Sequence, residues 1–171
     1  AAIINDISAF RADDAMLEVV AGGTAGAIAM HMRGTPKTMQ SMTEYADLVA
    51  EVAGLFRQTL DEFARRDIAS ERLMFDPGIG FGKTADQNLD LIAATPRFRE
   101  LGRPLLLGPS RKSFIGKLLG IEDPAGRDWA TAGLCAAAVL LGADVVRVHR
   151  VAGVREAVRM AGEVARRIPA G

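Results

Sequence analysis

The sequence has little of what nucleic-acid-binding and membrane proteins depend on. Its 21 basic and 21 acidic residues give a formal net charge of zero, so no excess charge attracts nucleic acid or an anionic membrane. One Trp and one Tyr are too few for a surface on which single-stranded bases stack. No apolar run reaches the roughly 18 residues that a membrane-spanning helix requires. We therefore expect neither nucleic acid nor a membrane as a partner.

Cysteine is nearly absent as well. Cys135 is the single cysteine, which rules out an internal disulfide framework and predicts the reducing environment of the cytoplasm. It lies in the apolar run Ala-Gly-Leu-Cys-Ala-Ala-Ala-Val and is interpreted as a small core residue, with a catalytic thiol as the alternative. The sequence opens on Ala1 inside the strand-like segment Ala-Ala-Ile-Ile, and we interpret it as a piece of a longer protein.

What the chain does contain is a regular alternation of short and long apolar segments. Hydrophobic residues make up 49% of its 171 residues, which is typical of a domain with a core of its own. The alternation predicts parallel β-α-β units, and no linker interrupts it, so we predict a single domain over residues 1–171. The predicted strands are 2–5, 25–30, 73–76, 104–107 and 145–149. The predicted helices lie near 13–21, 42–66, 87–100, 112–119, 128–142 and 152–168.

Polar residues at the ends of these strands distinguish between two α/β architectures. Every strand contributes one at or just past its carboxyl end, which favours part of a (β/α)8 TIM barrel, where all strand ends face one pocket. A doubly wound sheet would gather them near one switch point. A full barrel needs about 250 residues, so this chain supplies a portion with about five βα units and lacks the first three. The polar residues at or just past the carboxyl ends of the five strands are Asn5, His31, Asp76, Ser110 and His149.

The most informative segment is Asp-Pro-Gly-Ile-Gly-Phe-Gly-Lys at 76–83, where a predicted strand ends. Pro77 ends the strand, and the glycines allow positive φ angles and close approach of the backbone to a ligand. A carboxylate at Asp76 can accept two hydrogen bonds from an amino-pyrimidine edge, and Phe81 can pack against an aromatic substrate. Lys83 is interpreted either as an anion contact or as a solvated loop lysine. The alternative for the segment is a tight glycine turn with a capping Asp.

Two further loops carry cations beside turn residues. Segment 30–40, Met-His-Met-Arg-Gly-Thr-Pro-Lys-Thr-Met-Gln, offers flexible Met side chains for a flat ligand and Arg or Lys for a phosphate. His31 is interpreted as a structural histidine, because no second His stands at the spacing of a zinc site. Segment 108–116, Gly-Pro-Ser-Arg-Lys-Ser-Phe-Ile-Gly, opens a predicted helix, and Ser110, Ser113 and two cations there predict an anion site. A plain serine-capped helix is the alternative.

An asparagine and an Arg–His pair complete the candidate set. Asn5 can both donate and accept hydrogen bonds at the edge of a heterocycle, or it can form an Asx turn or a helix cap. Alternation along strand 145–149 places Arg147 and His149 on one face, where they can hold a diphosphate. A structural arginine inside the barrel is the alternative, which is disfavoured because an unpaired buried charge is costly.

Taken in their order along the chain, these segments resemble dihydropteroate synthase over essentially the whole sequence. The resemblance implies a pterin-binding (β/α)8 barrel, Mg²⁺ as cofactor, a homodimer and inhibition by sulfonamides. It implies that 6-hydroxymethyl-7,8-dihydropterin diphosphate and p-aminobenzoate condense to 7,8-dihydropteroate and diphosphate in folate synthesis. The matching segments are Ile-Asn-Asp-Ile-Ser, Met-His-Met-Arg-Gly-Thr-Pro-Lys-Thr-Met-Gln, Asp-Pro-Gly-Ile-Gly-Phe-Gly-Lys, Ser-Arg-Lys-Ser-Phe-Ile-Gly and Arg-Val-His.

The resemblance also implies which residues of this chain contact each part of the substrates. No metal ligand is among them, because the family's Asn that contacts the metal belongs to the absent N-terminal units. The catalytic residues would be Asp76, Lys112, Arg147 and His149. The pterin would contact Asn5, Met30, Asp76, Gly80 and Lys112. The p-aminobenzoate would contact Phe81, Lys112 and Ser113, and the diphosphate would contact Ser110, Arg147 and His149.

Two departures from the family pattern bear on activity. The three absent βα units hold part of the pterin site and two mobile loops, so we predict little or no turnover by the isolated chain. The family usually has Asp after Arg-Val-His, where this chain has Arg150. Two alternative functions therefore stay open: a methyltetrahydrofolate methyltransferase-like pterin-binding domain, and a non-catalytic, degenerate paralogue.

Overall fold

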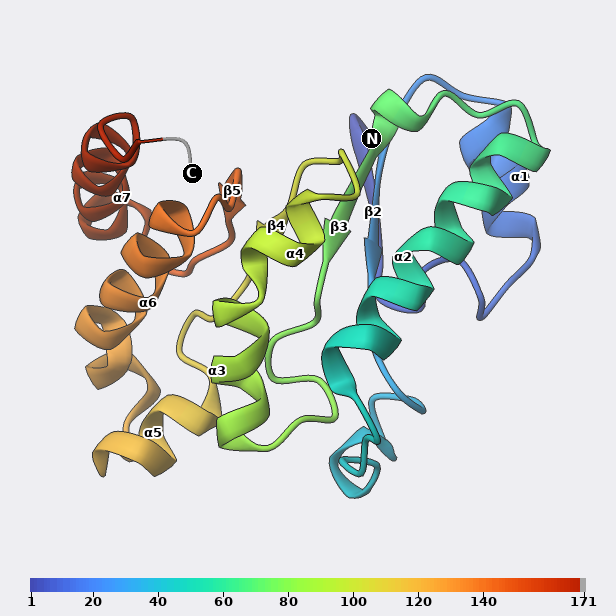
Figure 1. Ribbon diagram of the computed structural model, residues 1–171. Helices are drawn as coiled ribbons and strands as arrows, with labels where there is room; N and C mark the ends of the chain where they lie inside the picture. The colour runs from blue at the N-terminus through green and yellow to red at the C-terminus, as the bar shows by residue number, and fades with distance from the viewer. Residues whose placement is uncertain (170–171) are drawn as a thin grey trace.

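Parallel strands alternate with helices along the chain, as the hydrophobic pattern predicts (Figure 1). The computed structural model describes residues 1–169. Within that range no helix combines the length and the apolar character needed to cross a membrane. The strands are β1 (Ile3–Asp6), β2 (Gly26–Met30), β3 (Leu73–Asp76), β4 (Leu106–Leu107) and β5 (Val145–Val146). The helices are α1 (Ala15–Ala21), α2 (Leu48–Arg65), α3 (Ala85–Ala93), α4 (Thr95–Arg99), α5 (Ser113–Leu119), α6 (Asp128–Leu140) and α7 (Val151–Ala165), with 3-10 turns at Met39–Ser41, Ser70–Arg72 and Pro124–Arg127.

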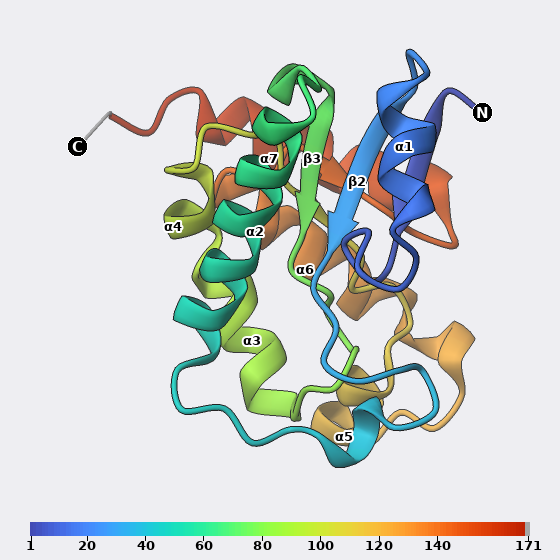
Figure 2. The same cartoon turned by 90° about the vertical axis from the view of Figure 1, so that its right-hand side faces the viewer.

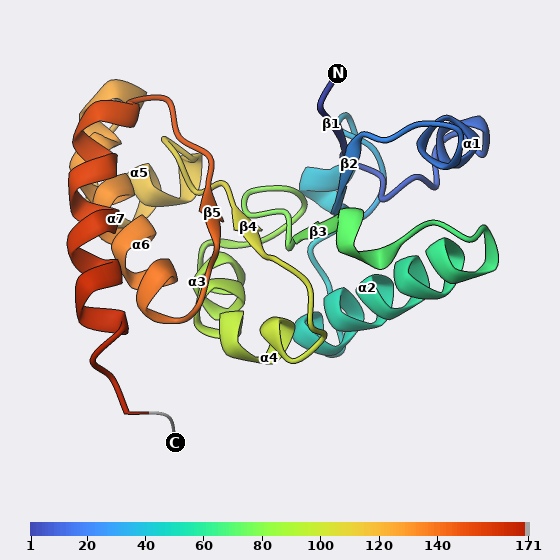
Figure 3. The ribbon, with the colours of Figure 1, turned by 90° about the horizontal axis from the view of Figure 1, so that it is seen from above.

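The five strands form one curved row in their sequence order. Strands β1, β2 and β3 pair in parallel, with Met30 opposite Asp76, and β4 pairs in parallel with β5. A bridge between Phe75 and Leu105 joins the two groups. Figure 3 shows this row from above as an open arc with the helices on its outer side. Because a doubly wound sheet would break the sequence order at its switch point, the arrangement is that of a portion of a barrel.

Aromatic side chains hold the outer helices against the strands. The ring of Phe56, from α2, stacks on Phe75 of β3 with the ring centroids 4.2 Å apart. Phe98 of α4 meets Phe56 edge-on at 5.6 Å. Val52, Phe56 and Phe63 of α2 are buried, and α2 itself runs alongside β3 (Figure 2). Burial of each Phe contributes about 2–3 kcal/mol, so this layer holds α2 and α4 against β3.

Cys135 belongs to the core, as predicted. It is fully buried on α6 and packs with Ala132 and with Val154 of α7. Burial raises the pKa of its thiol to about 11, so the side chain is a protonated thiol at neutral pH. The alternative of a catalytic thiol is thereby excluded for a reaction that needs a thiolate.

Several predicted boundaries were wrong, and local hydrogen bonds explain the differences. The helix predicted from residue 42 begins at Leu48, because the side chain of Asp47 caps it by accepting the N–H of Ala50. The helix predicted over 87–100 begins at Ala85 and is divided into α3 and α4. Pro96 stands in the first turn of α4, where its missing N–H costs nothing.

The fourth predicted strand is shorter than 104–107, since β4 is Leu106–Leu107, and further differences concern the last strand and the helix before it. The last predicted strand is only two residues long, since its partner β4 ends where Gly108 and Pro109 follow. Helix α6 begins at Asp128, whose carboxylate binds Arg111, and it ends at Leu140, two residues before the predicted end.

The glycine loop after β3 depends on Gly78. This residue has a φ of +72°, and a Cβ at this position would lie 1.9 Å from the carbonyl oxygen of His31. Gly78→Ala should therefore lower the free energy of unfolding by about 3 kcal/mol, through clash and backbone strain together. The measurement is urea denaturation followed by circular dichroism.

Gly102→Ala is the matched control for this prediction. Gly102 has a φ of +73° but nothing within 4 Å of a Cβ, so its loss should be about 1 kcal/mol from the backbone alone. Equal losses in the two variants would contradict a close approach of the Gly78 loop to His31.

Candidate active site

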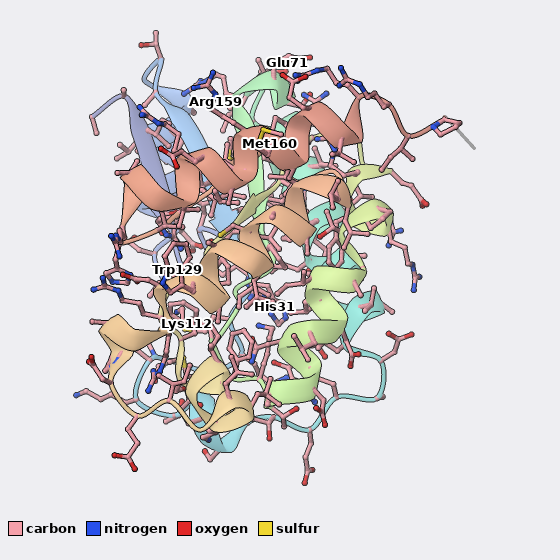
Figure 4. The ribbon with its side chains drawn as sticks, turned by 90° about the vertical axis from the view of Figure 1, so that its left-hand side faces the viewer. His31, Glu71, Lys112, Trp129, Arg159 and Met160 are labelled. Carbon is pink, nitrogen blue, oxygen red and sulfur yellow. The ribbon has the colours of Figure 1, made fainter. Side chains whose placement is uncertain are left out.

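Side chains from several strand ends meet at one pocket on the carboxyl side of the arc. The pocket has a volume of about 310 Å³. Figure 4 shows Lys112 and His31 toward this end of the molecule, with Glu71 at the opposite end, before β3 begins. We predicted that the loops after the strands converge, and this is confirmed for the loops after β3, β4 and β5. The lining residues are Phe81, Gly108, Ser110, Lys112, Arg147, Val148 and His149.

Asp76 is a buried carboxylate at the base of this region. Its side chain is 1% exposed, because it stands at the end of β3 between β2 and β4. One oxygen accepts the N–H of Gly78 at 2.8 Å, and the other accepts a hydrogen bond from Arg147 at 3.1 Å. Burial raises the pKa of Asp76, while the Gly78 N–H, Arg147, Lys112 and Lys83 oppose that rise. A carboxylate held in this way has further lone pairs for a ligand's N–H groups.

Arg147 links the ends of strands β1, β3 and β5. Its guanidinium donates to Asn5 Oδ1 at 2.9 Å and to Asp76 Oδ2 at 3.1 Å. It crosses the end of β4 at Gly108, where a Cβ would lie 3.1 Å from Nη2. The Asx turn considered for Asn5 is made by its neighbour Asp6, whose carboxylate accepts two backbone N–H groups. Asn5 and Asp76, predicted for the pterin, are thus joined to Arg147, predicted for the diphosphate.

Lys112 is positioned by an aromatic ring and a glycine. Its ammonium lies 4.1 Å from the ring centroid of Phe81, a cation–π contact. Its alkyl chain passes over Gly80, where a Cβ would come within 2.7 Å of Lys112 Cδ. Burial lowers the pKa of Lys112 and Arg147 lowers it further, whereas Asp76 raises it. The lysine therefore stands as a partly desolvated cation beside the Asp76–Arg147 pair.

The predicted anion site at the start of α5 is divided between two places. Arg111 has a φ of +57° and turns from the pocket to Asp128, which accepts hydrogen bonds from it at 2.7 and 2.9 Å. These hydrogen bonds lower the pKa of Asp128, and Arg150 lies 4.0 Å from the same carboxylate. Lys112 is the cation of this segment that lines the pocket. Ser113 is exposed and is not among the lining residues.

Ser110 and His149 form a hydrogen-bonded pair at the pocket wall. Ser110 is buried, with 6% of its surface exposed, whereas His149 is exposed. Ser110 Oγ lies 2.8 Å from His149 Nδ1 and accepts the backbone N–H of His149 at 3.1 Å. The serine hydroxyl, predicted as a direct diphosphate contact, thus already holds the imidazole in place.

The loop after β2 contributes less to the pocket than its composition indicates. Met30 is fully buried at the end of β2, opposite Asp76. Arg33, considered for a phosphate, forms an ion pair with Glu51 and lies 4.1 Å from the ring centroid of Tyr45. This loop therefore supports the strand ends more than it lines the pocket.

Lys83 is buried inside the glycine loop and binds its carbonyl groups. Both interpretations from the sequence, an anion contact and a solvated loop lysine, were therefore wrong. Lys83 is 6% exposed, and its ammonium donates to the carbonyls of Gly78 at 3.0 Å and Phe81 at 2.9 Å. It also lies 3.2 Å from Nδ1 of His31. Burial lowers the pKa of Lys83 to about 7. His31 is buried as well, which confirms its predicted structural role.

Removal of the Lys83 ammonium should loosen this loop. Lys83→Met keeps the buried alkyl chain but leaves the carbonyls of Gly78 and Phe81 without their donor. We expect the free energy of unfolding to fall by about 3 kcal/mol, because two buried acceptors lose their hydrogen-bond donor. Lys117→Met, at an exposed position on α5, is the control for urea denaturation and should be nearly neutral. Comparable stability of the two variants would show that the hydrogen bonds from Lys83 to Gly78 and Phe81 do not stabilise the loop.

The sequence analysis missed Asn88, which supports the same loop. It is 1% exposed on α3, and its side-chain oxygen accepts the N–H of Gly80. Its amide group donates to the carbonyl of Thr84 at 2.6 Å. An Asn on the buried face of an amphipathic helix is the signal that would have found it, because buried amides need partners.

Fold and site together define an α/β-barrel protein with a cationic binding pocket at the carboxyl ends of its strands. Residues 1–149 match the family described as pterin binding enzyme, and the chain belongs to that family. It is 44% identical to dihydropteroate synthase of Synechocystis sp. over 159 residues, which cover 93% of this chain and 55% of that protein. The chain thus spans about half the length of this curated relative.

Solved structures of dihydropteroate synthases share the fold. The Stenotrophomonas maltophilia enzyme with active-site-bound imidazole has a TM-score of 0.92 and 38% identity, covering 99% of this chain and 63% of its own. The Thermus thermophilus enzyme in complex with 6HMPPP has a TM-score of 0.88 and 34% identity, covering 95% and 64%. The same enzyme in complex with 4-aminobenzoate has a TM-score of 0.87 and 34% identity, covering 95% and 65%. The predicted partial barrel and family are confirmed.

Proposed function

We propose that the protein to which this chain belongs is a dihydropteroate synthase. It would condense 6-hydroxymethyl-7,8-dihydropterin diphosphate with p-aminobenzoate to give 7,8-dihydropteroate and diphosphate. The observation that carries the proposal is a buried carboxylate, Asp76, that binds Arg147 at a pocket lined by three cationic or N–H-bearing side chains. A ligand with a neutral heterocycle at one end and an anion at the other fits this polarity. The three side chains are Lys112, Arg147 and His149.

The pterin end would bind at Asp76 and Asn5. The carboxylate can accept hydrogen bonds from the amino-pyrimidine edge of the pterin, and the Asn5 amide can both donate and accept. Arg147 binds both groups from one side, and the remaining lone pairs of Asp76 and the NH₂ group of Asn5 are left for the pterin. Met30 and Gly80 lie beside Asp76 and Lys112 and would shape the site for a flat ring.

The reaction needs charge stabilisation more than a base. The C–O bond between the pterin methylene group and the diphosphate breaks, and the electron pair leaves with the diphosphate. The aryl amine nitrogen of p-aminobenzoate then forms the new C–N bond and loses a proton. Arg147 and His149 would stabilise the leaving anion, and Asp76 would stabilise the electron-poor pterin. Phe81, Lys112 and Ser113 would contact p-aminobenzoate, and sulfonamides would compete for the same place.

Mg²⁺ stays a proposal that rests on the resemblance alone. Residues 1–169 contain no group of three or more His, Cys, Asp or Glu side chains that could hold a metal ion. Asp76 is buried and bound to Arg147, so it does not suit a Mg²⁺ ligand. These residues do not form a Mg²⁺ site, and the neutralisation of the diphosphate is assigned to Arg147, His149 and Lys112.

Two further proposals concern the assembly and the location of the protein. We propose a homodimer, which the exposed apolar side chains of Trp129 and Met160 on α6 and α7 support (Figure 4). Analytical ultracentrifugation of the full-length protein tests it, and a monomer at micromolar concentration would refute it. A cytoplasmic location stays a prediction based on the single cysteine, Cys135.

The experiment that tests the function is an assay of the full-length protein with both substrates. Formation of 7,8-dihydropteroate and release of diphosphate, each dependent on both substrates, would support the proposal. Methyl transfer to a corrinoid without any need for p-aminobenzoate would instead support the methyltransferase alternative. The isolated chain of 171 residues should show little or no turnover in the same assay.

Arg150 tests the alternative of a degenerate paralogue. Its side chain is 61% exposed, lies 4.0 Å from Asp128 and does not line the pocket. Arg150→Asp in the full-length protein should therefore change kcat/KM by less than about threefold, because the side chain contacts no part of the pocket. A large gain in turnover would show that Arg150 suppresses activity and would favour degeneration.

A further inference from the structure

Ser110 has the contacts of a residue that orients another side chain. It follows β4, whereas His149 follows β5, and the two meet at 2.8 Å between Ser110 Oγ and His149 Nδ1. The same oxygen accepts the backbone N–H of His149 at 3.1 Å. Within residues 1–169 these are the two hydrogen bonds found for the Ser110 hydroxyl, which is 6% exposed. Both hydrogen bonds of the serine hydroxyl are therefore made with His149.

The direction of the hydroxyl proton follows from this geometry. A serine oxygen has two lone pairs and a single hydrogen. One lone pair already accepts the N–H of His149, and the hydrogen needs an acceptor because the hydroxyl is buried. His149 Nδ1 is the acceptor within reach. In a neutral imidazole, an Nδ1 that accepts a hydrogen bond places the ring's own hydrogen on Nε2.

We propose that Ser110 is a positioning residue that holds neutral His149 in its Nε2–H form, with that N–H free to donate to an anion in the pocket. Nε2 has no hydrogen-bond partner among the described residues, and His149 lines the pocket with Lys112 and Arg147. The opposite tautomer would present a lone pair to the anion. The proposal deepens the proposed function and rests on it, since the anion in question is the diphosphate.

The first test is the tautomer of His149 in the full-length protein. Long-range ¹H–¹⁵N correlation spectra of ¹⁵N-histidine-labelled protein distinguish Nε2–H from Nδ1–H directly, and His149→Gln identifies the signals. We expect Nε2–H in the unsubstituted protein, a mixture of forms in Ser110→Ala, and Nε2–H again in Ser110→Thr, which keeps the hydroxyl. The signals of buried His31 should not change, which shows that the fold is intact.

The second test uses inorganic pyrophosphate as the probe. Its titration should shift the Nε2 signals of His149, and Ser110→Ala should weaken its binding about five- to tenfold, the value of one lost hydrogen bond. Ser110→Thr should bind within about twofold of the unsubstituted protein.

An Nδ1–H form in the unsubstituted protein would overturn the proposal, even if Ser110→Ala fails to fold. Nε2–H persisting unchanged in Ser110→Ala would overturn it as well. A tautomer that depends on Ser110, found together with no pyrophosphate binding at all, would support the positioning role. That result would count against the proposed function instead.

Discussion

Asp76→Asn is expected to weaken the binding of a dihydropterin ligand about 100-fold, a loss of about 3 kcal/mol. The carboxylate is 1% exposed and accepts hydrogen bonds from Gly78 and Arg147. An amide at this position offers one acceptor and one donor group, and its NH₂ would face either the guanidinium or the donor edge of the pterin. The measurement is a fluorescence titration of the full-length protein with a dihydropterin ligand.

Asp90→Asn is the matched control for this titration. Asp90 lies on α3 with an exposed side chain, so the same loss of charge there should leave the affinity unchanged. Circular dichroism of both variants separates a loss of binding from a loss of fold. Unchanged affinity in a folded Asp76→Asn protein would show that the pterin is held elsewhere, and it would remove the main support for the proposed function.

The second large effect is acid destabilisation through His31. Burial and the nearby cations Lys83, Arg11 and Arg33 lower the pKa of His31 from 6.5 to about 3. Between these values the unfolded chain binds a proton that the folded chain does not, so the free energy of unfolding falls as the pH is lowered from 6.5 toward 3. The full difference corresponds to about 5 kcal/mol. Urea denaturation at pH 6.5, 5 and 4 measures it.

His31→Asn should remove most of this pH dependence. The amide does not titrate, and its oxygen can still accept a hydrogen bond from Lys83, so the loop keeps a partner for the ammonium. His149→Asn is the control, because His149 is exposed and hydrogen-bonded to Ser110 instead. If the unsubstituted protein and His31→Asn lose stability in parallel on acidification, the carboxylates rather than His31 cause the loss.

Lys83 makes the free energy of unfolding depend on pH in a second, higher range. Burial lowers its pKa from 10.5 to about 7, so the folded chain releases the proton before the unfolded chain does. The free energy of unfolding therefore rises as the pH increases from 7 to 10.5, and it falls when the pH returns to 7. His31 and Lys83 thus act in separate pH ranges, although their side chains are in contact.

Much of the fold followed from local pattern. Short apolar segments bounded by turn residues predicted the strands, and the longer segments between them predicted the helices. Parallel β-α-β units then place all carboxyl strand ends on one side, so the predicted positions of Asp76 and His149 were sound. The helix ends were less predictable, because single caps such as Asp47 decide them.

The roles of individual polar groups depended on residues far apart in the chain. Asp76 and Arg147 are 71 residues apart, and the sequence placed them in separate subsites although they form one ion pair. Lys83 was taken for a surface or anion-binding lysine, because its carbonyl partners become visible only when the glycine loop is folded.

The sequence by itself determined the order of the strands and the kinds of side chain at their ends. Hydrophobic spacing and turn residues act over a few positions, and they are written in the chain. Only the tertiary structure decided which polar groups are free for a substrate and which are already engaged, as Arg111 is by Asp128 and Ser110 is by His149. The physical reason is that a buried polar group must find a partner, and packing of the strands and helices selects that partner.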